Sequence, residues 1–390
     1  MFNNYKYFFI ILASITHLAF AQTDNISVIG IGRLGLCTAL CFEKAGYNVL
    51  GVDVQQNYVD QINNKTLNSS EPNVCNYLKT SKNFRATTSL DEALNFADIY
   101  FIIVPTPSTP YQEAYDHSML SKLLFEINKR KVENKHVIIC CTVFPGYVRN
   151  VAKHLLQDCK NISVSYNPEF IAQGNIIYGF ENPDMVLIGQ GSVQAGDILE
   201  KIYFKTCKNK PQICRMSAES AEITKLSINC FVTTKIAFAN MLGDAADQTP
   251  GADKNDILNA VGKDSRIGSK YLKPGYGFGG PCFPRDNRAL GSYIKKIGIA
   301  PLIPQATDNA NKLHAKFMAE RLLAQNLEQY VFEDVNYKDN CEVIILEESQ
   351  KLAVAQEIAK QGKRVLIRDK KNVISEVQQK FGNLFEYQTI

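Results

Sequence analysis

The chain has 390 residues, enough for two or three domains at about 150 residues per domain. Lysine and arginine total 43 and aspartate and glutamate 39, giving a net charge of +4, with 45% hydrophobic and 21% charged residues. This ordinary globular composition excludes a disordered chain, a collagen-like chain and a coiled-coil rod. It also argues against a dedicated nucleic-acid binder, which would be more basic.

The sequence contains eleven cysteines, an odd number, and no C-x-x-C pair. This pattern argues against a disulfide framework, and the usual ligand spacing of a zinc site is missing. We therefore expect no structural metal, and we expect most cysteines to be small buried side chains in a reducing compartment.

Residues 1–25 form a leader that differs from the rest of the chain. Lys6 precedes a short apolar run that ends at Ala19-Phe20-Ala21, the pattern of a secretory signal peptide. The run is too short and too polar to be a good membrane-spanning helix. The alternative is a wrongly assigned gene start, although the next methionine after Met1 is Met119.

Residues 26–216 alternate short apolar strands with helices, which predicts a doubly wound parallel sheet in an α/β fold. The predicted strands are Ile26–Gly30, Asn48–Val54, Phe101–Val104, His136–Thr142 and Ser163–Tyr166, and the predicted helices are Leu36–Ala45, Ser118–Lys131 and Val148–Leu156.

Residues 217–325 predict a helical central domain. Apolar residues recur at helical spacing through Ser217–Gln248, so we expect one long helix that joins domains or protomers. The other predicted helices are Asp253–Val261, Asn287–Ile297 and the connector Ala306–Gln325.

Residues 326–390 predict a smaller, Rossmann-like C-terminal domain, apparently truncated because the chain ends at Ile390. Its predicted elements are the strand Val343–Leu346, the helix Leu352–Lys360 and the strand Val365–Ile367.

Between the first strand and the first helix stands a G-x-G-x-x-G motif, Gly30-Ile31-Gly32-Arg33-Leu34-Gly35. Its glycines permit a tight turn and close approach of a pyrophosphate to the helix N-terminus. Asp53 closes the second strand, where its carboxylate would bond a ribose hydroxyl and repel a 2′-phosphate. The motif therefore predicts NAD binding, against the alternative of a glycine-rich turn without a ligand.

Residues 275–286 hold four glycines and two prolines around Cys282. Such a loop is rigid and exposed, as a substrate loop requires, and a thiol is intrinsically nucleophilic. A nearby cation would raise its thiolate fraction. The alternative is a structural cysteine in an ordinary loop.

Lys225 and Asn229 are four residues apart on the long helix and so share one face. An ammonium and an amide together would hold a developing oxyanion, although a solvated helix face would show the same spacing. Glu169, in Asn167-Pro168-Glu169-Phe170, follows a short strand. It is a candidate general base or a turn residue that caps the next helix.

Taken together, these segments resemble one family, the UDP-glucose/GDP-mannose dehydrogenases, from Ile26 to about Asp369. Seven motifs occur in the family's order: Gly30–Gly35, Val104-Pro105-Thr106-Pro107, Thr142-Val143-Phe144-Pro145-Gly146, Asn167-Pro168-Glu169-Phe170, the Lys225/Asn229 pair, Arg266-Ile267-Gly268 and the loop around Cys282.

The resemblance implies a four-electron oxidation at C6 of a nucleotide-linked hexose with two NAD per sugar, through a thiohemiacetal and a thioester on Cys282. UDP-glucose, giving UDP-glucuronate, is the substrate we expect first. The implied catalytic residues are Cys282, Lys225, Asn229, Asp286, Glu169 and Thr142. The implied cofactor-binding residues are Gly30 to Gly35, Asp53, Val104, Pro105, Thr106 and Thr142.

The substrate-binding residues implied by the resemblance are Glu169, Phe170, Gln173, Lys225, Asn229, Arg266, Tyr271, Phe278, Gly279 and Lys338. Arg266 would reach the nucleotide pocket of a partner protomer, which implies a homodimer. A nucleotide sugar and NAD favour a cytoplasmic location, whereas the leader favours a secretory route.

The sequence departs from the family's pattern at several positions. Gln173 stands where the family has glutamate, Arg285 where it has lysine, and Glu347-Glu348-Ser349 where many members have Arg-Glu-Ser. Val331–Val335 lacks the glycine of the family's strand, and the chain stops before the family's closing strands.

Alternative functions remain open at this level. One is a catalytically silent NAD-binding or interaction protein derived from this family, another an enzyme that acts on a UDP-N-acetylhexosamine or GDP-mannose. A third is a two-domain hydroxyacid or 6-phosphogluconate-type dehydrogenase, which does not require the cysteine loop.

Overall fold

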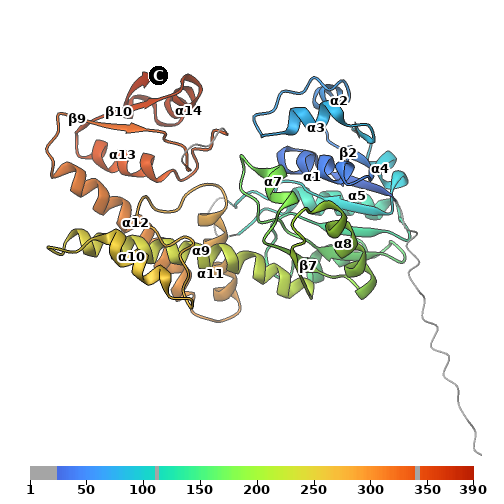
Figure 1. The fold of residues 1–390 in the computed structure, drawn as a ribbon. Helices are drawn as coiled ribbons and strands as arrows, with labels where there is room; N and C mark the ends of the chain where they lie inside the picture. Colours follow the sequence, from blue (N-terminus) through green and yellow to red (C-terminus); the bar gives the residue numbers. More distant parts are fainter. Residues whose placement is uncertain (1–23, 110–113, 339–342) are drawn as a thin grey trace, which may run out of the picture.

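The computed structural model describes residues 24–109, 114–338 and 343–390 (Figure 1). The leader predicted over residues 1–25 lies outside the described residues except for its last two. Across the described part of the chain, no helix is long and apolar enough to cross a membrane.

The N-terminal part is built on one eight-stranded sheet with the order β3-β2-β1-β4-β5-β6-β7-β8. Its strands are β1 Asn25–Ile29, β2 Asn48–Val52, β3 Phe84–Thr87, β4 Ile99–Ile102, β5 His136–Ile139, β6 Ser163–Tyr166, β7 Met185–Gly189 and β8 Gln212–Met216. Neighbouring strands run parallel except β6 and β7, which meet antiparallel at Tyr166 and Gly189. The predicted doubly wound α/β fold is therefore confirmed.

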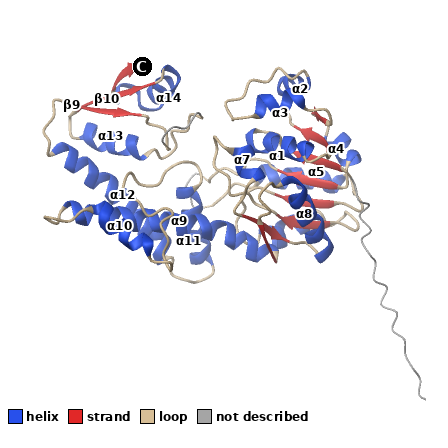
Figure 2. Cartoon of the chain, viewed as in Figure 1, coloured by secondary structure: helices blue, strands red, loops and turns tan. Residues whose placement is uncertain are grey.

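Helices cover both faces of this sheet (Figure 2). Two separate clusters of buried apolar side chains lie between the sheet and the helices, one on each face. The helices are α1 Arg33–Lys44, α2 Gln56–Asn63, α3 Val74–Thr80, α4 Leu90–Phe96, α5 Ser118–Lys129, η1 Val148–Ala152, α6 Lys153–Leu155, α7 Ile176–Glu181 and α8 Val193–Thr206. The α-helix predicted over Val148–Leu156 begins instead as a π-helical turn, η1, before α6 completes it.

A single helix, α9 (Ala218–Asp247, 30 residues), carries the chain from this sheet into the central part (Figure 1). It begins where predicted, because the Ser217 hydroxyl accepts a hydrogen bond from the Ser220 N–H at 3.2 Å and so caps the helix. The remaining central helices are α10 Lys254–Lys263, α11 Phe283–Lys296 and α12 Leu302–Leu323.

The start of α11 differs from the prediction. The helix begins at Phe283, directly after Cys282, rather than at Asn287. Pro284 lies in its first turn, where a missing N–H costs no intrahelical hydrogen bond. The cysteine therefore stands at a helix N-terminus rather than in the middle of a loop.

The C-terminal part is a small parallel sheet with the order β11-β10-β9. Its elements are β9 Gln329–Glu333, α13 Gln350–Lys360, β10 Arg364–Asp369, α14 Lys371–Phe381, η2 Gly382–Leu384 and β11 Glu386–Thr389. The expected helix and second strand are confirmed, but the strand expected at Val343–Leu346 is wrong. That segment buries Val343, Ile345 and Leu346, and Leu346 packs in the core of the small domain, but the segment does not join the sheet.

Candidate active site

The predicted dinucleotide motif lies at the switch point of the large sheet, between β1 and β4. Gly30 turns with φ +93°, and a Cβ there would lie 2.4 Å from the carbonyl oxygen of Ile103. A Cβ on Gly35 would lie 1.9 Å from the carbonyl oxygen of Gly30. The turn is therefore closed to any larger residue, and it brings the loops after β1 and β4 together, where α/β folds bind ligands.

The first turn of α1 is open towards this point. Gly32 has nothing within 4 Å of the place where a Cβ would be, and no side chain caps the helix. Uncapped N–H groups at a helix N-terminus donate hydrogen bonds to a bound pyrophosphate. Ile31 is buried beneath the turn, Arg33 is exposed and Leu34 packs partly against the core. These features fit a bound dinucleotide.

Asp53 closes β2 at the same edge of the sheet and is half-buried. One of its carboxylate oxygens accepts the Gln55 N–H at 3.0 Å, which leaves the other oxygen to bond a ribose. On the opposite side, Thr106 donates to the carbonyl oxygen of Thr142 at 2.8 Å and ties the loops after β4 and β5 together. Val104 and Pro105 precede Thr106 in that loop.

Asp53 gives the first testable prediction. Asp53→Ala removes the charge that would repel a 2′-phosphate, so the preference for NAD over NADP should fall by roughly tenfold or more. The ratio of kcat/KM for the two cofactors checks this. Asp60→Ala, at an exposed position on α2, serves as the control and should leave the ratio unchanged. An unaltered ratio in Asp53→Ala would contradict the role.

Cys282 stands at the N-terminus of α11, where the residue is exposed to solvent although protein atoms surround its thiol. Loss of hydration, followed by the charge of Asp286, raises the pKa of its thiol, whereas Arg285 and Lys225 lower it. A nearby cation, as the sequence led us to expect, is therefore present, but the lowering of the thiol pKa by Arg285 and Lys225 is smaller than the rise caused by lost hydration and Asp286.

The glycines before Cys282 let this loop pass close to the C-terminal part. Gly280 has φ +81°, and a Cβ there would lie 2.3 Å from the Tyr337 ring. Its N–H donates to the carbonyl oxygen of Glu347 at 2.9 Å. A Cβ on Gly279 would lie 2.3 Å from the carbonyl oxygen of Glu348. Larger residues would push the two parts of the chain apart.

Lys225 and Asn229 lie on the face of α9 that looks into this region, rather than on a solvated face. Lys225 is only 7% exposed, and its ammonium donates to the carbonyl oxygen of Glu169 at 2.7 Å. It also lies 4.6 Å from the centroid of the Phe170 ring. The Asn229 amide donates to the Asp286 carboxylate at 2.7 Å. The structure thus brings four of the predicted catalytic residues, Cys282 included, to the junction of α9 and α11.

Glu169 stands at the carboxyl end of β6, beside this group. Loss of hydration raises the pKa of its carboxyl to about 7, although a hydrogen bond from Tyr203 and the charge of Lys225 both lower it. The Tyr203 hydroxyl lies 2.7 Å from the carboxylate of Glu169 and 2.6 Å from the side-chain oxygen of Asn167. A carboxyl with a pKa near neutrality suits proton transfer to and from a substrate hydroxyl.

The segment from Thr142 to Gly146 is held from α9. Glu222, fully buried, accepts the N–H groups of Gly146 at 2.5 Å and Val148 at 2.8 Å. Loss of hydration raises the pKa of this carboxyl to about 7, and the two backbone hydrogen bonds lower it. Glu222 thus fixes the helix that carries Lys225 to the loop that carries Thr142.

The predicted substrate residues are more dispersed. Gln173 accepts a hydrogen bond from Arg33 at 2.7 Å, so it borders the dinucleotide turn. Tyr271 packs edge-on against Phe283 with ring centroids 6.4 Å apart. Arg266 is exposed and paired with Asp264 at 2.7 Å; the structure does not bring it to Cys282 within one chain.

Phe278 and Lys338 occupy contrasting positions. Phe278 is 3% exposed, and its N–H and carbonyl both bond the Asn311 side chain at 2.9 Å. Phe278 therefore anchors the glycine-rich loop before Cys282 to α12 through Asn311. Lys338 is exposed and follows Tyr337, whose ring contacts Gly280.

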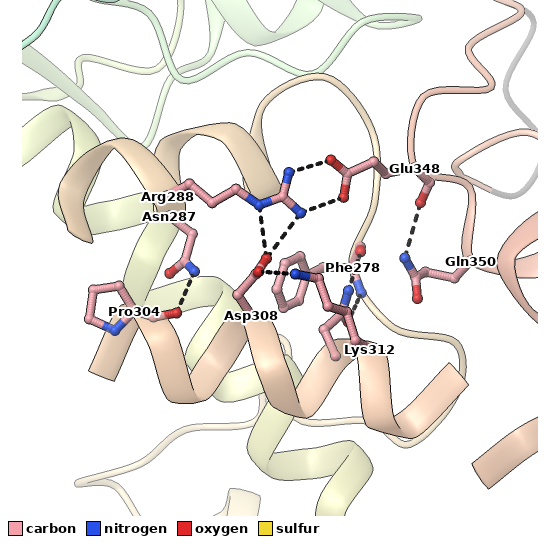
Figure 3. A network of polar contacts seen from close by, with 9 residues as sticks. Phe278, Asn287, Arg288, Pro304, Asp308, Lys312, Glu348 and Gln350 are labelled. Carbon is pink, nitrogen blue, oxygen red and sulfur yellow. Dashed lines mark hydrogen bonds and ion pairs between the residues drawn. The ribbon is translucent and has the colours of Figure 1, made fainter. Parts of the chain in front are cut away.

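A charged cluster locks the cysteine helix to the C-terminal part (Figure 3). The guanidinium of Arg288 on α11 makes two hydrogen bonds to Glu348, at 2.6 and 2.9 Å, and it also pairs with Asp308 on α12, at 3.1 Å from its Nε and 3.0 Å from a terminal nitrogen. Two-pronged arginine–carboxylate pairs fix geometry well. Arg288 therefore connects α11 to α12 and to the segment that carries Glu348.

Three supporting residues have no signal in the sequence: Tyr203, Glu222 and Tyr115. Each is distant in the sequence from the residue that it bonds; Tyr115, for example, is 171 residues away from Asp286. Only the folded chain brings them together. Among the residues that the structure describes, no group of three or more His, Cys, Asp and Glu side chains could hold a metal ion.

Comparison with known proteins agrees with this arrangement. The NAD-binding domain of the UDP-glucose/GDP-mannose dehydrogenase family matches residues 24–207, and the central domain of that family matches residues 219–313. The chain is 32% identical over 304 residues to UDP-glucose 6-dehydrogenase of Rickettsia bellii, covering 76% of this chain and 69% of that protein. It is 30% identical over 309 residues to GDP-mannose 6-dehydrogenase of Pseudomonas aeruginosa, covering 75% and 70%.

Among solved structures, a UDP-glucose dehydrogenase from the archaeon Pyrobaculum islandicum matches with a TM-score of 0.84 and 26% identity. The match covers 95% of this chain and 87% of that one. The chain therefore belongs to the UDP-glucose/GDP-mannose dehydrogenase family of NAD-dependent oxidoreductases.

Proposed function

We propose that the protein oxidises the C6 hydroxyl of a nucleotide sugar to the carboxylate, with UDP-glucose as the first substrate to test. The observation that carries the proposal is the junction of α9 and α11. There Cys282 directly precedes the helix α11, whose Asp286 accepts a hydrogen bond from Asn229 at 2.7 Å. Lys225, on the same face of α9 as Asn229, donates to the carbonyl of Glu169. A nucleophile, two oxyanion donors and a base thus share one site.

In this proposal Gly30–Gly35 and Asp53 would hold NAD at the switch point, where it would supply a hydride acceptor for each of two oxidations. Glu169 takes the proton from the C6 hydroxyl as the C6 hydride leaves, which gives the aldehyde. The Cys282 sulfur then bonds to C6, and the thiol proton ends on the former carbonyl oxygen. Lys225 and Asn229 stabilise the negative charge that develops on that oxygen.

Loss of the second hydride from C6 and of the hydroxyl proton converts this thiohemiacetal into a thioester on Cys282. Water then adds to the acyl carbon and the C–S bond breaks. One water proton ends on the Cys282 thiol, and the other is released as the acid ionises. We propose that Asp286 and Thr142 orient that water.

The substrate is identified by a direct experiment. The purified protein is incubated with NAD and, separately, UDP-glucose, GDP-mannose, UDP-N-acetylglucosamine and UDP-N-acetylmannosamine, with NADH followed by absorbance and product mass by mass spectrometry. We expect the highest kcat/KM with UDP-glucose and a product of UDP-glucuronate mass. NAD binding without NADH formation from any of the four would instead favour a catalytically silent family member.

The raised pKa of Glu169 gives a prediction of pH dependence. The base is effective only when ionised, so kcat/KM should fall by about tenfold per pH unit below pH 7, following its pKa of about 7. Tyr203→Phe removes a hydrogen bond that lowers this pKa, and it should shift the midpoint to higher pH. A pH profile measured from 5 to 9 checks both statements. If Glu169→Gln keeps the same acidic limb, another group is the base.

We also propose a homodimer formed through α9. On this helix Phe231, Phe238 and Met241 are 68%, 46% and 52% exposed, more apolar surface than a solvated helix would show. A second copy of the chain would cover it, and the exposed Arg266 would then reach its partner's site.

Light scattering at micromolar concentration tests this assembly. We expect at least two protomers for the parent and one for Phe238→Asp. Phe125→Asp changes an exposed phenylalanine of α5 and should leave the parent mass unaltered. A parent that is fully active as a monomer would contradict the proposal.

A further inference from the structure

The segment of residues 114–117 reaches from the NAD-binding part into the central domain. Tyr115 is 4% exposed and packs in a cluster with Leu226 and Cys230 of α9 and Ala289 and Leu290 of α11. A β-bridge between Ser108 and Tyr115 and a hydrogen bond from the Asp116 N–H to the carbonyl of Pro107, at 2.7 Å, tie the segment to the loop after β4. The ring is thus anchored to both parts of the protein.

The hydroxyl of Tyr115 points at the Asp286 carboxylate. It donates to one carboxylate oxygen at 2.7 Å, while the Asn229 amide donates to the other at 2.7 Å. The Arg285 guanidinium lies 5.1 Å from the centroid of the Tyr115 ring. Asp286 itself is only 1% exposed. Each carboxylate oxygen therefore accepts one hydrogen bond, one from the NAD-binding part and one from α9, and these two bonds determine the plane of the carboxylate. The Nε of Arg285 also lies 3.8 Å from the oxygen that Tyr115 bonds, too far for a hydrogen bond but within ion-pair distance.

The hydroxyl remains a donor throughout the working pH range. Burial and the neighbouring Asp286 charge hold the pKa of Tyr115 well above its usual value.

We propose that Tyr115 is a positioning residue for the hydrolysis of the thioester, acting through Asp286. This inference rests on the proposed covalent function. In the hydrolysis step water adds to the acyl carbon, the C–S bond breaks and the Cys282 thiol is regenerated. Asp286 accepts a hydrogen bond from that water, and Tyr115 together with Asn229 holds the accepting oxygen in the orientation that aims the water at the acyl carbon.

Tyr115→Phe isolates this function. Phenylalanine retains the apolar packing and the ring beneath Arg285, and it removes only the hydrogen bond to a charged oxygen. We expect kcat to fall roughly 10-fold to 100-fold, with the KM for the nucleotide sugar within about twofold. The two hydride transfers precede hydrolysis, so a rapid burst of about two NADH per site should persist. The acylated protein should then accumulate and be detected by intact-mass spectrometry.

A double-mutant cycle with Asp286→Asn tests whether the hydroxyl acts through Asp286. If it does, the double variant turns over no more slowly than Asp286→Asn alone. Tyr100→Phe is the matched control, because Tyr100 is also buried and donates to a carbonyl, that of Leu94, at 2.7 Å, away from the site. It should retain the parental kcat.

The measurements on these variants decide whether Tyr115 acts through Asp286. A kcat for Tyr115→Phe within twofold of the parent, additive losses in the double variant, or loss of the native fold on removal of this single hydroxyl would each overturn the role of Tyr115. In those cases the parent's own activity still supports the proposed function. A parent that forms no NADH from any of the four nucleotide sugars overturns the proposed function, and this inference with it.

Discussion

Replacing Cys282 with serine is expected to lower kcat by at least about 1,000-fold without changing NAD affinity. A hydroxyl is a far weaker nucleophile than a thiol near neutral pH, and an ester hydrolyses more slowly than a thioester. The first oxidation needs only a base and a hydride acceptor, so the loss should fall on the second oxidation and on product release. The dinucleotide turn lies in a different part of the chain and should be unaffected.

Steady-state turnover, NAD titration and intact-mass spectrometry of the variant check this expectation. Sugar that remains covalently bound to the serine variant would support the role of Cys282. Cys75→Ser is the matched control, since Cys75 is a half-buried thiol on α3 that donates to the carbonyl of Leu67. Parental turnover in Cys282→Ser would show that another group carries the second oxidation.

Lys225→Met should lower kcat by about 100-fold to 1,000-fold, the usual loss for one oxyanion donor. Methionine fits the 7% exposed position and keeps contact with Phe170, but it provides no charge. The charge of Lys225 also lowers the pKa of Glu169, so the acidic limb of the pH profile should move to higher pH in the variant. A role that is only structural would not predict that shift.

Lys135→Met provides the control for this variant. Lys135 is another largely buried lysine, 14% exposed, whose ammonium donates to the carbonyl of Ala97 at 2.9 Å and to the carboxylate of Asp98 at 2.8 Å. It directly precedes β5 and so lies at the opposite end of that strand from the site. Its kcat and pH profile should match the parent. An unchanged kcat in Lys225→Met would remove the lysine from the catalytic group.

The large sheet could be predicted because its signals are local. Apolar runs separated by helices, and a glycine turn at the first strand end, place strands β1, β2, β4, β5 and β6 within a few residues. Strands such as β8 escaped prediction because Gln212–Met216 has polar residues at Gln212 and Arg215, which fit no alternation, and its side chains are exposed or only partly buried. Edge strands give the weakest periodic signal.

Two errors have identifiable physical causes. Segment 275–284 is so rich in glycine and proline that it predicts a loop up to Asn287, yet Pro284 is compatible with a first helical turn. The apolar run Val343–Leu346 predicts a strand, but β9, with Tyr330 and Phe332 buried and Val331 and Glu333 exposed, takes the place beside β10. Apolar character alone cannot distinguish a strand from a buried extended segment.

The candidate site was predictable only in part. The i, i+4 spacing placed Lys225 and Asn229 on one face of a helix, but spacing could not show which way that face pointed. Their packing against Glu169 and Asp286 depends on contacts 56 and 57 residues apart in the chain. The supporting hydroxyls of Tyr115 and Tyr203 depend on similar tertiary contacts, and no local pattern marks them.

The stoichiometry of the reaction tests the central claim most directly. NADH and the product are quantified together after complete conversion of a limiting amount of the preferred nucleotide sugar. A four-electron oxidation on one site predicts two NADH for every nucleotide sugar consumed, a carboxylate product and no free aldehyde. One NADH for every sugar, with aldehyde released into solution, would contradict the covalent mechanism at Cys282.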